Sequence, residues 1–324
     1  NSDEGTQTIV LGFANTSATQ TFSGTVTLDG TGTANTIKVV SSATGDDTNT
    51  GKTQVISGVI SEAGGAKNLV KDGVGILKLE GNNDYTGGTT INNGILKIGN
   101  AGNDADLGTG DITINKGKLE VGDGDTLTNT IDGGTGKSMI GGDGTLSGAT
   151  TGESKLIIGS GASKYVDNVS PGTGISSSLT PTNQQVTLGV EGAGDKGELA
   201  VGTLTVTNLG LYDGGVYDWE ITDFKGGVVQ NATDGTDFDV LGFTTLTFDS
   251  SSSASFGINA FSVDLTSGNA GSVANLGAHT GDAGILFLDG PNHAAITWGH
   301  ADHTLLGNGS WQQADYFNVD DRAY

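Results

Sequence analysis

The sequence predicts an all-β protein whose main part is a β-solenoid, a stack of short strands joined by tight turns. Apolar and polar residues alternate over many short segments, which is the pattern of strands with one buried face. Glycine makes up 57 of the 324 residues, far above the usual ~7%, and proline only 3. Because the glycines lack the triplet period of collagen, they indicate turn positions with positive φ between strands.

The block from Gly73 to Gly99 is the unit that the rest of the chain repeats. It reads as three strands, near residues 76–79, 89–91 and 96–98, separated by turns rich in Asn and Gly. A single coil of this kind cannot bury its own apolar face, so it requires copies above and below, with a spacing of roughly 20–50 residues. Copies of its last strand follow at Gly117–Gly122, Gly152–Gly159 and Gly197–Gly202.

These copies, together with alternating segments between residues 6 and 60, place the solenoid at residues 1–196. From 197 to 324 the composition changes: all three tryptophans lie here, and after Lys225 the only basic residue is Arg322. This change predicts a second unit, an aromatic-rich, acidic and β-sandwich-like cap domain that covers the end of the stack.

The overall composition excludes several classes of protein. A formal net charge of −23 argues against nucleic-acid binding, which requires a basic surface, and against an anionic membrane surface. The absence of cysteine excludes disulfides. No run of ~18 apolar residues is present, so we expect no transmembrane segment. The first residue is Asn1, which predicts a processed form or a fragment whose export signal has been removed.

Residues 75–99 resemble the autotransporter-associated (passenger-associated) β-strand repeat. That repeat has the pattern G-x-L-x-L-x-G-x-N-x-Y-x-G-x-T-x-I-x-x-G-x-L-x-I/L-G. The positions that match it are Gly75, Leu77, Leu79, Gly81, Asn83, Tyr85, Gly87, Thr89, Ile91, Gly94, Leu96, Ile98 and Gly99, and residues 108–122 continue in the same way. The resemblance implies a right-handed parallel β-helix in a secreted bacterial protein of the cell surface or extracellular matrix.

Two stretches contain candidate metal ligands. Asp123 and Asp125 lie in an acidic turn and offer oxygen ligands for Ca²⁺. His300 and His303, near His293, offer nitrogen ligands. Neither stretch matches an established metal-binding repeat, so solvated turns and loops are the alternative. We expect no cofactor, and structural Ca²⁺ is the exception that the sequence leaves open.

β-Solenoids also include polysaccharide-active enzymes, in which paired carboxylates act as acid and base. Asp218 with Glu220, and Asp237 with Asp239, stand at alternate positions that share one face of a strand. A substrate groove would also present aromatic platforms, yet residues 86–164 contain no aromatic residue. We therefore expect no enzyme, and keep a glycan-binding module or a polysaccharide-active enzyme as the alternative.

The sequence favours a secreted structural or adhesive surface protein that self-associates into an extracellular fibre or matrix. The expected partners are further copies of the same chain, with surface glycans as the second candidate. Edge strands can be extended by a strand from a neighbouring molecule. The candidate polymer contacts are Thr8, Val10, Phe22, Val26 and Leu28.

Overall fold

The computed structural model describes residues 7–11, 19–39, 53–99, 107–134, 136–160, 164–173, 201–221, 239–248, 255–264, 269–271, 286–289, 296–297 and 310–312. These residues form strands, turns and bends without a helix, so the all-β prediction is confirmed. Within the same ranges, no helix is long and apolar enough to cross a membrane.

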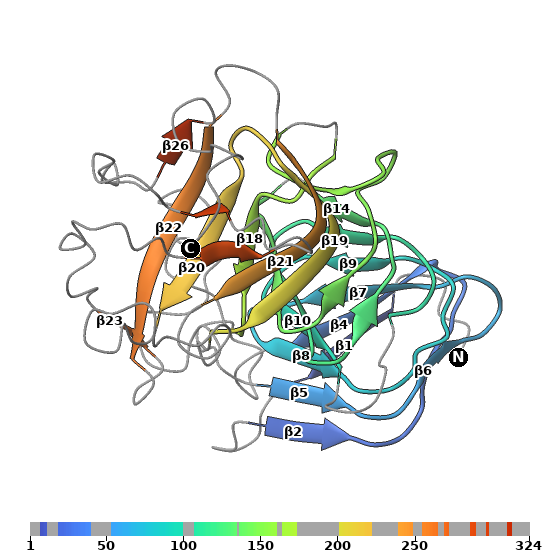
Figure 1. The fold of residues 1–324 in the computed structure, drawn as a ribbon. Coiled ribbons are helices and arrows are strands. Elements are labelled where there is room, and N and C mark those ends of the chain that lie inside the picture. The colour runs from blue at the N-terminus through green and yellow to red at the C-terminus, as the bar shows by residue number, and fades with distance from the viewer. Residues whose placement is uncertain are drawn as a thin grey trace.

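The chain winds through stacks of strands, and it usually adds one strand to one stack before moving to the next (Figure 1). Sheet A consists of β1 (Gln7–Leu11), β4 (Ala34–Val39), β7 (Asn68–Asp72), β9 (Thr89–Ile91), β11 (Ile112–Ile114) and β14 (Ile131–Gly133). Sheet B consists of β2 (Thr19–Phe22), β5 (Thr53–Ile56), β8 (Ile76–Leu79), β10 (Ile95–Ile98), β12 (Gly117–Val121), β15 (Ser138–Gly142), β18 (Asn168–Pro171), β20 (Val216–Ile221), β22 (Ser255–Asp264), β23 (Asn269–Gly271) and β26 (Ser310–Gln312).

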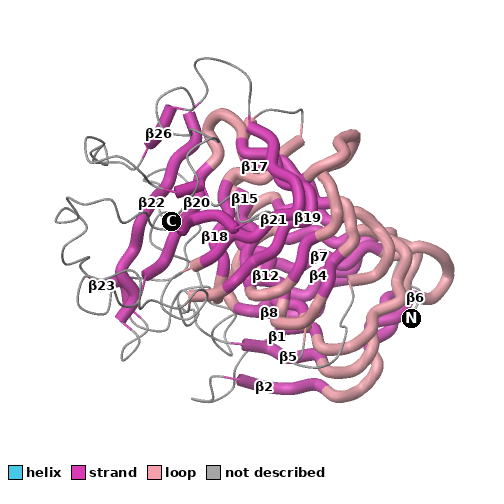
Figure 2. Tube along the Cα trace, in the orientation of Figure 1, coloured by secondary structure: helices cyan, strands magenta, loops and turns pink. Residues whose placement is uncertain are grey.

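Sheet C and one small sheet complete the set. Sheet C consists of β13 (Thr126–Leu127), β16 (Thr145–Leu146), β17 (Leu156–Ile158), β19 (Thr203–Leu211), β21 (Val240–Phe248), β24 (Leu286–Asp289) and β25 (Ile296–Thr297). β3 (Val26–Leu28) pairs with β6 (Ile60–Glu62). Most neighbouring strands within a sheet are parallel and come from successive coils, as in β8, β10 and β12. Figure 2 shows the strands joined by loops and turns. The predicted parallel β-helix is confirmed.

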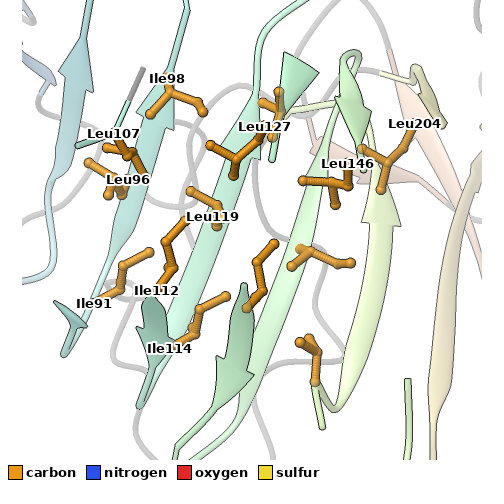
Figure 3. Packing of buried hydrophobic residues seen from close by; sticks show 14 of the residues in the cluster. Ile91, Leu96, Ile98, Leu107, Ile112, Ile114, Leu119, Leu127, Leu146 and Leu204 are labelled. Atoms are coloured by element: carbon orange, nitrogen blue, oxygen red, sulfur yellow. The ribbon is translucent and has the colours of Figure 1, made fainter. Parts of the chain in front are cut away.

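The core runs along the inside of the coils. Leu77, Leu96 and Leu119 stand in register on three adjacent strands of sheet B, and each is at most 1% exposed. Figure 3 shows Leu96 and Leu119 packed together with Ile112 of sheet A. Strand β8 alternates between half-buried and buried positions, as the period of two predicts. Each inward row therefore continues from coil to coil, at about 4.8 Å per step.

Parallel pairing continues across the boundary expected at residues 196 and 197. Thr145 of β16 stands in register with Thr205 of β19, and Asn168 of β18 stands in register with Val216 of β20. Among the strands named above, antiparallel pairing occurs only for β22 with β23, β22 with β26, and β24 with β25. The domain boundary and the capping role of residues 197–324 stay predictions.

Tyr85 fills the interior where the chain runs from β8 to β9 without a third strand. Its side chain is fully buried, and its hydroxyl shares a 2.6 Å hydrogen bond with Thr89 Oγ1. Burial raises the pKa of the phenol, so it stays neutral. In the next coil Gly108 lies against this ring: a Cβ there would stand 2.7 Å from Tyr85 Cδ2 and closer still to the Tyr85 carbonyl oxygen. Position 108 therefore has no room for a side chain while Tyr85 occupies this place in the preceding coil.

We expect Gly108→Ala to destabilise the protein by about 1–3 kcal/mol, the usual cost of an added carbon in a packed interior. The reason is the collision with the backbone and ring of Tyr85, neither of which can move freely. The measurement is the urea midpoint. Gly24→Ala is the matched control, because a Cβ at Gly24 meets nothing within 4 Å. Equal midpoints for the two variants would contradict the packing argument.

Candidate functional site

One end of the β-helix is open among the described residues. β1, β2 and β3 are the outermost strands of sheet A, of sheet B and of the small sheet, so each has one edge without a strand partner in that part of the chain. In Figure 1, β2 lies at the lower end of the stack, outside β5 and β8. The backbone N–H and C=O groups along such strand edges are able to pair with another strand.

Apolar side chains that would be core residues elsewhere are exposed at this open end. Ile9 is 50% exposed although its register partner on the next coil, Ile37, is buried. Phe22 is 44% exposed although it stands in register with buried Ile56. The inward row thus reaches the last described coil, where no further described coil covers it.

The predicted polymer contacts fall into two groups. Thr8, Val10 and Phe22 are exposed, with Val10 at 54%. Val26 is half-buried, and Leu28, at 3% exposed, is part of the core. Their role in contacting a neighbour stays a prediction. The sequence analysis did not single out Ile9, and its exposure depends on its place in the outermost described coil.

A row of charged residues lies on the outer face of sheet B, and two of its members, Lys118 and Glu120, are nevertheless buried. Lys118 Nζ is 3.5 Å from Glu120 Oε1 and donates to the Gly172 carbonyl at 3.1 Å, and Lys97 Nζ is 3.6 Å from Glu120 Oε2. The side chains of Lys118 and Glu120 are 0% and 3% exposed. Lys118 crosses the next strand at Gly141, where a Cβ would stand 2.7 Å from its Nζ. We call Lys97, Lys118, Glu120 and the nearby Asp143 the ionic row.

Asp143 lies beside the lysines of the ionic row and has a raised pKa. Burial raises the pKa of its carboxyl, while the backbone N–H of Thr203, at 3.2 Å, and the charges of Lys97 and Lys118 act in the opposite direction. The ionic row was missed because Lys97 and Glu120 occupy outward positions in the alternation. A signal was present: aligning the copies Gly94–Gly99 and Gly117–Gly122 places Lys97 directly against Glu120.

The candidate metal ligands are not brought together in the described residues. Asp123 is exposed, whereas Asp125 is 3% exposed and packs against Gly99 and Gly122. In the described ranges, no group of three or more His, Asp or Glu could hold a metal ion. His300 and His303 lie outside the described residues. The metal assignments therefore stay predictions.

The carboxylates considered for catalysis are buried wherever their side chains are described. Asp218 is fully buried and accepts a 2.9 Å hydrogen bond from Asn168 Nδ2. Asp239 is also fully buried and accepts from the backbone N–H of Gly202 at 2.8 Å. Both carboxylates therefore bind groups of the fold itself. Asp237 and the side chain of Glu220 lie outside the described part of the chain.

Comparison with known proteins agrees with this architecture. Residues 69–98 match the passenger-associated-transport-repeat family. We call residues 69–98 the passenger repeat. A segment of 108 residues, 33% of the chain, is 41% identical to the Adhesin BmaC autotransporter of Brucella suis biovar 1 (strain 1330), and it spans only 3% of that relative's length. No solved structure matches the chain significantly. The resemblance predicted from the sequence is confirmed.

The passenger repeat buries a charged residue, Lys71, as well as Tyr85. Lys71 points inward from β7 and is fully buried. Its Nζ donates to the carbonyl oxygens of Gly73 at 2.6 Å and Asn93 at 2.8 Å, and so bridges two successive turns between sheets A and B. Gly94 has a positive φ of 71°, and a Cβ there would stand 2.9 Å from Lys71 Nζ. Lys71 therefore joins two neighbouring coils at the corner between sheets A and B.

We expect Glu120→Gln to destabilise the protein by roughly 3 kcal/mol, because it leaves the buried Lys118 ammonium without its carboxylate. The measurement is the urea midpoint at neutral pH. Lys78→Gln is the matched control: it breaks the partly exposed pair with Glu80, and such pairs contribute about 1 kcal/mol or less. A Glu120→Gln variant as stable as Lys78→Gln would show that the ionic row does not stabilise the coil stack.

The raised pKa of Asp143 gives a pH-dependent prediction. In the folded protein this carboxyl binds its proton more tightly than in the unfolded chain, so it costs stability at neutral pH, and the cost disappears as the pH falls through the raised value. Asp143→Asn keeps an acceptor for the Thr203 N–H and removes the titration. We expect its urea midpoint to exceed that of the parent at neutral pH and to converge with it in acid. A difference that is constant with pH would contradict this assignment.

Proposed function

We propose that the chain functions as a passenger segment of a secreted adhesin at the bacterial cell surface. The observation that carries the proposal is the passenger repeat at residues 69–98, which lies within an uninterrupted stack of parallel strands. The similarity to an autotransporter named as an adhesin supports the same reading. The relative is far longer than the aligned segment, so adhesion by this segment itself requires a direct test.

The β-helix suits this role for mechanical reasons. Backbone ladders run along the stack and join each coil to the next, for example through the Gly122 N–H to Ile98 O bond at 2.8 Å. Pulling along the stack must break several such bonds at once, which makes the stack stiff. The net charge of −23 keeps such molecules apart in solution except where a surface lacks charge. A stiff acidic stack of this kind can hold its adhesive loops away from the cell envelope.

We further propose that the segment self-associates into a fibre or matrix outside the cell. Exposed apolar side chains on β1 and β2 support this: Ile9, Val10 and Phe22 are 50%, 54% and 44% exposed. Electron microscopy of the purified chain at high concentration tests the idea. Regular filaments or ordered assemblies are the expected result, and single isolated particles at every concentration would overturn it.

Adhesion is tested with fluorescent beads coated with the purified chain and counted on cultured epithelial cells. We expect several-fold more bound beads than with the same chain unfolded before coupling, because the adhesive loops depend on the folded stack for their spacing. Removing cell-surface glycans enzymatically before the assay distinguishes a glycan receptor from a protein receptor. Binding no greater than that of the unfolded control would refute the adhesive function.

A further inference from the structure

We propose that Asn93 is a site of spontaneous modification, at which the side-chain amide is lost by deamidation and the passenger repeat gains a carboxylate. The reaction requires only water and the residues around the turn between β9 and β10. It goes beyond the proposed function and does not depend on adhesion or on self-association. Three features of the turn carry the inference: a placed nucleophile, a fixed frame, and a positive charge beside the atom that becomes negative.

The nucleophile is the backbone nitrogen of Gly94. Its N–H donates to Asn93 Oδ1 at 2.9 Å, so the nitrogen lies beside Cγ, the side-chain carbonyl carbon of the preceding residue. The N–H of Asn92, by contrast, bonds to the neighbouring coil. Gly94 has no side chain that could shield its nitrogen, and none would fit, since a Cβ there would stand 2.5 Å from the Gly75 carbonyl oxygen. Attack by this nitrogen on Cγ closes a succinimide ring.

The fixed frame comes from hydrogen bonds on both sides of the turn. The Asn92 N–H donates to the Lys71 carbonyl oxygen at 2.8 Å, and the Gly94 carbonyl oxygen accepts from the Lys118 N–H at 3.0 Å. These bonds hold the turn to the coils before and after it, so the reacting atoms stay together. In an unfolded chain, ring closure must first fix the same backbone bonds, at a cost in conformational entropy. Asn93 itself is half-buried, so water still reaches it.

The positive charge belongs to Lys71. The Gly94 nitrogen must lose its proton to attack, and the amide anion that results carries much of its charge on the main-chain carbonyl oxygen of Asn93. Lys71 Nζ donates to this oxygen at 2.8 Å. It also donates to the carbonyl oxygens of Gly73 at 2.6 Å and Asp72 at 3.1 Å, which suits the three N–H groups of an ammonium. A buried cation at this oxygen stabilises the anion in the way an oxyanion hole does.

The reaction balances with water as its co-reactant. The proton of the Gly94 N–H passes to solvent, the nitrogen bonds to Asn93 Cγ, and the Cγ–Nδ2 bond breaks as the amide takes up a proton and leaves as ammonia. Water then opens the succinimide. Opening between Cγ and the Gly94 nitrogen leaves an aspartate and the original backbone, whereas opening at the other carbonyl gives an isoaspartate with an additional backbone carbon. Because both sides of the turn are held by neighbouring coils, the aspartate fits the stack better.

Peptide mapping by mass spectrometry tests the proposal on the parent chain. The chain is incubated at neutral pH, either folded or unfolded in guanidinium chloride, and the conversion of Asn93 is followed with time. Asn308–Gly309, a second Asn–Gly pair in the sequence, serves as a reference for the reaction in the unfolded sample. We expect Asn93 to convert several-fold faster in the folded chain than in the unfolded chain, because the fold supplies both the frame and the charge. An equal or lower rate in the folded chain would overturn the proposal.

Two lysine variants isolate the contribution of Lys71. Lys71→Met removes the ammonium but keeps an unbranched side chain, and it should slow the conversion of Asn93 in the folded chain by about tenfold or more. Lys67→Met is the matched control: Lys67 is 4% exposed, and its Nζ donates to the Gly30 carbonyl oxygen at 2.8 Å, in a different turn. Circular dichroism shows whether each variant is folded, and the parent-chain comparison decides alone if Lys71→Met is not. Equal rates in two folded variants would refute the role of Lys71.

The products distinguish deamidation from a competing reaction in the same turn. If the side-chain nitrogen of Asn93 attacked the main-chain carbonyl carbon of the same residue, the bond to Gly94 would break and two fragments would appear. Aspartate or isoaspartate at position 93 of an intact chain supports the proposal, and cleavage as the main product would overturn it. Asn93→Gln, whose longer side chain closes a ring less readily, should give neither product under the same conditions.

Discussion

The structure depends on the covering of each coil by the next. A coil of this protein is built of short strands, such as the four residues of β10. Its inward residue Leu96 is buried because its register partners Leu77 and Leu119 lie on either side of it. The same contact satisfies the backbone, because N–H groups in turns also bond along the stack, as Asn92 N–H does to Lys71 O at 2.8 Å. Stability is therefore a property of neighbouring coils rather than of any one coil.

Tight stacking restricts what can occupy the corners. Where one coil places a large group inside, the next coil must leave room, and this explains why Tyr85 is followed by Gly108, and Lys71 by Gly94. The outer face of sheet B follows the same rule, with Gly141 beneath Lys118. The passenger repeat can be understood in these terms: its glycines lie where a neighbouring coil passes, and its Asn, Tyr and Thr residues supply hydrogen bonds within the stack.

Much of the fold could be predicted from the sequence, because period-two alternation and recurrence both report on coil stacking. Leu77 and Leu96 are identifiable as inward residues without coordinates. Three features could not be obtained in this way. Lys118 and Glu120 of the ionic row are buried on an outward face, and burial there depends on the assembled fold. Thr145 pairs with Thr205 across a long separation that no local pattern reveals. The exposure of Ile9 depends on which coil is outermost.

The covering of each coil by the next also explains the exposure found in the outermost described coil. Ile9 and Phe22 are in the same row as buried Ile37 and Ile56, so they retain the shape and polarity of core residues without the covering coil. A parallel stack has no sequence-independent way to end, since each edge offers its ladder groups to the next strand. Within the described residues, the edges of β1 and β2 therefore keep the ladder groups and the apolar side chains that a neighbouring coil covers elsewhere in the stack. The burial of an inward residue is thus decided by the coil next to it and not by its own alternation.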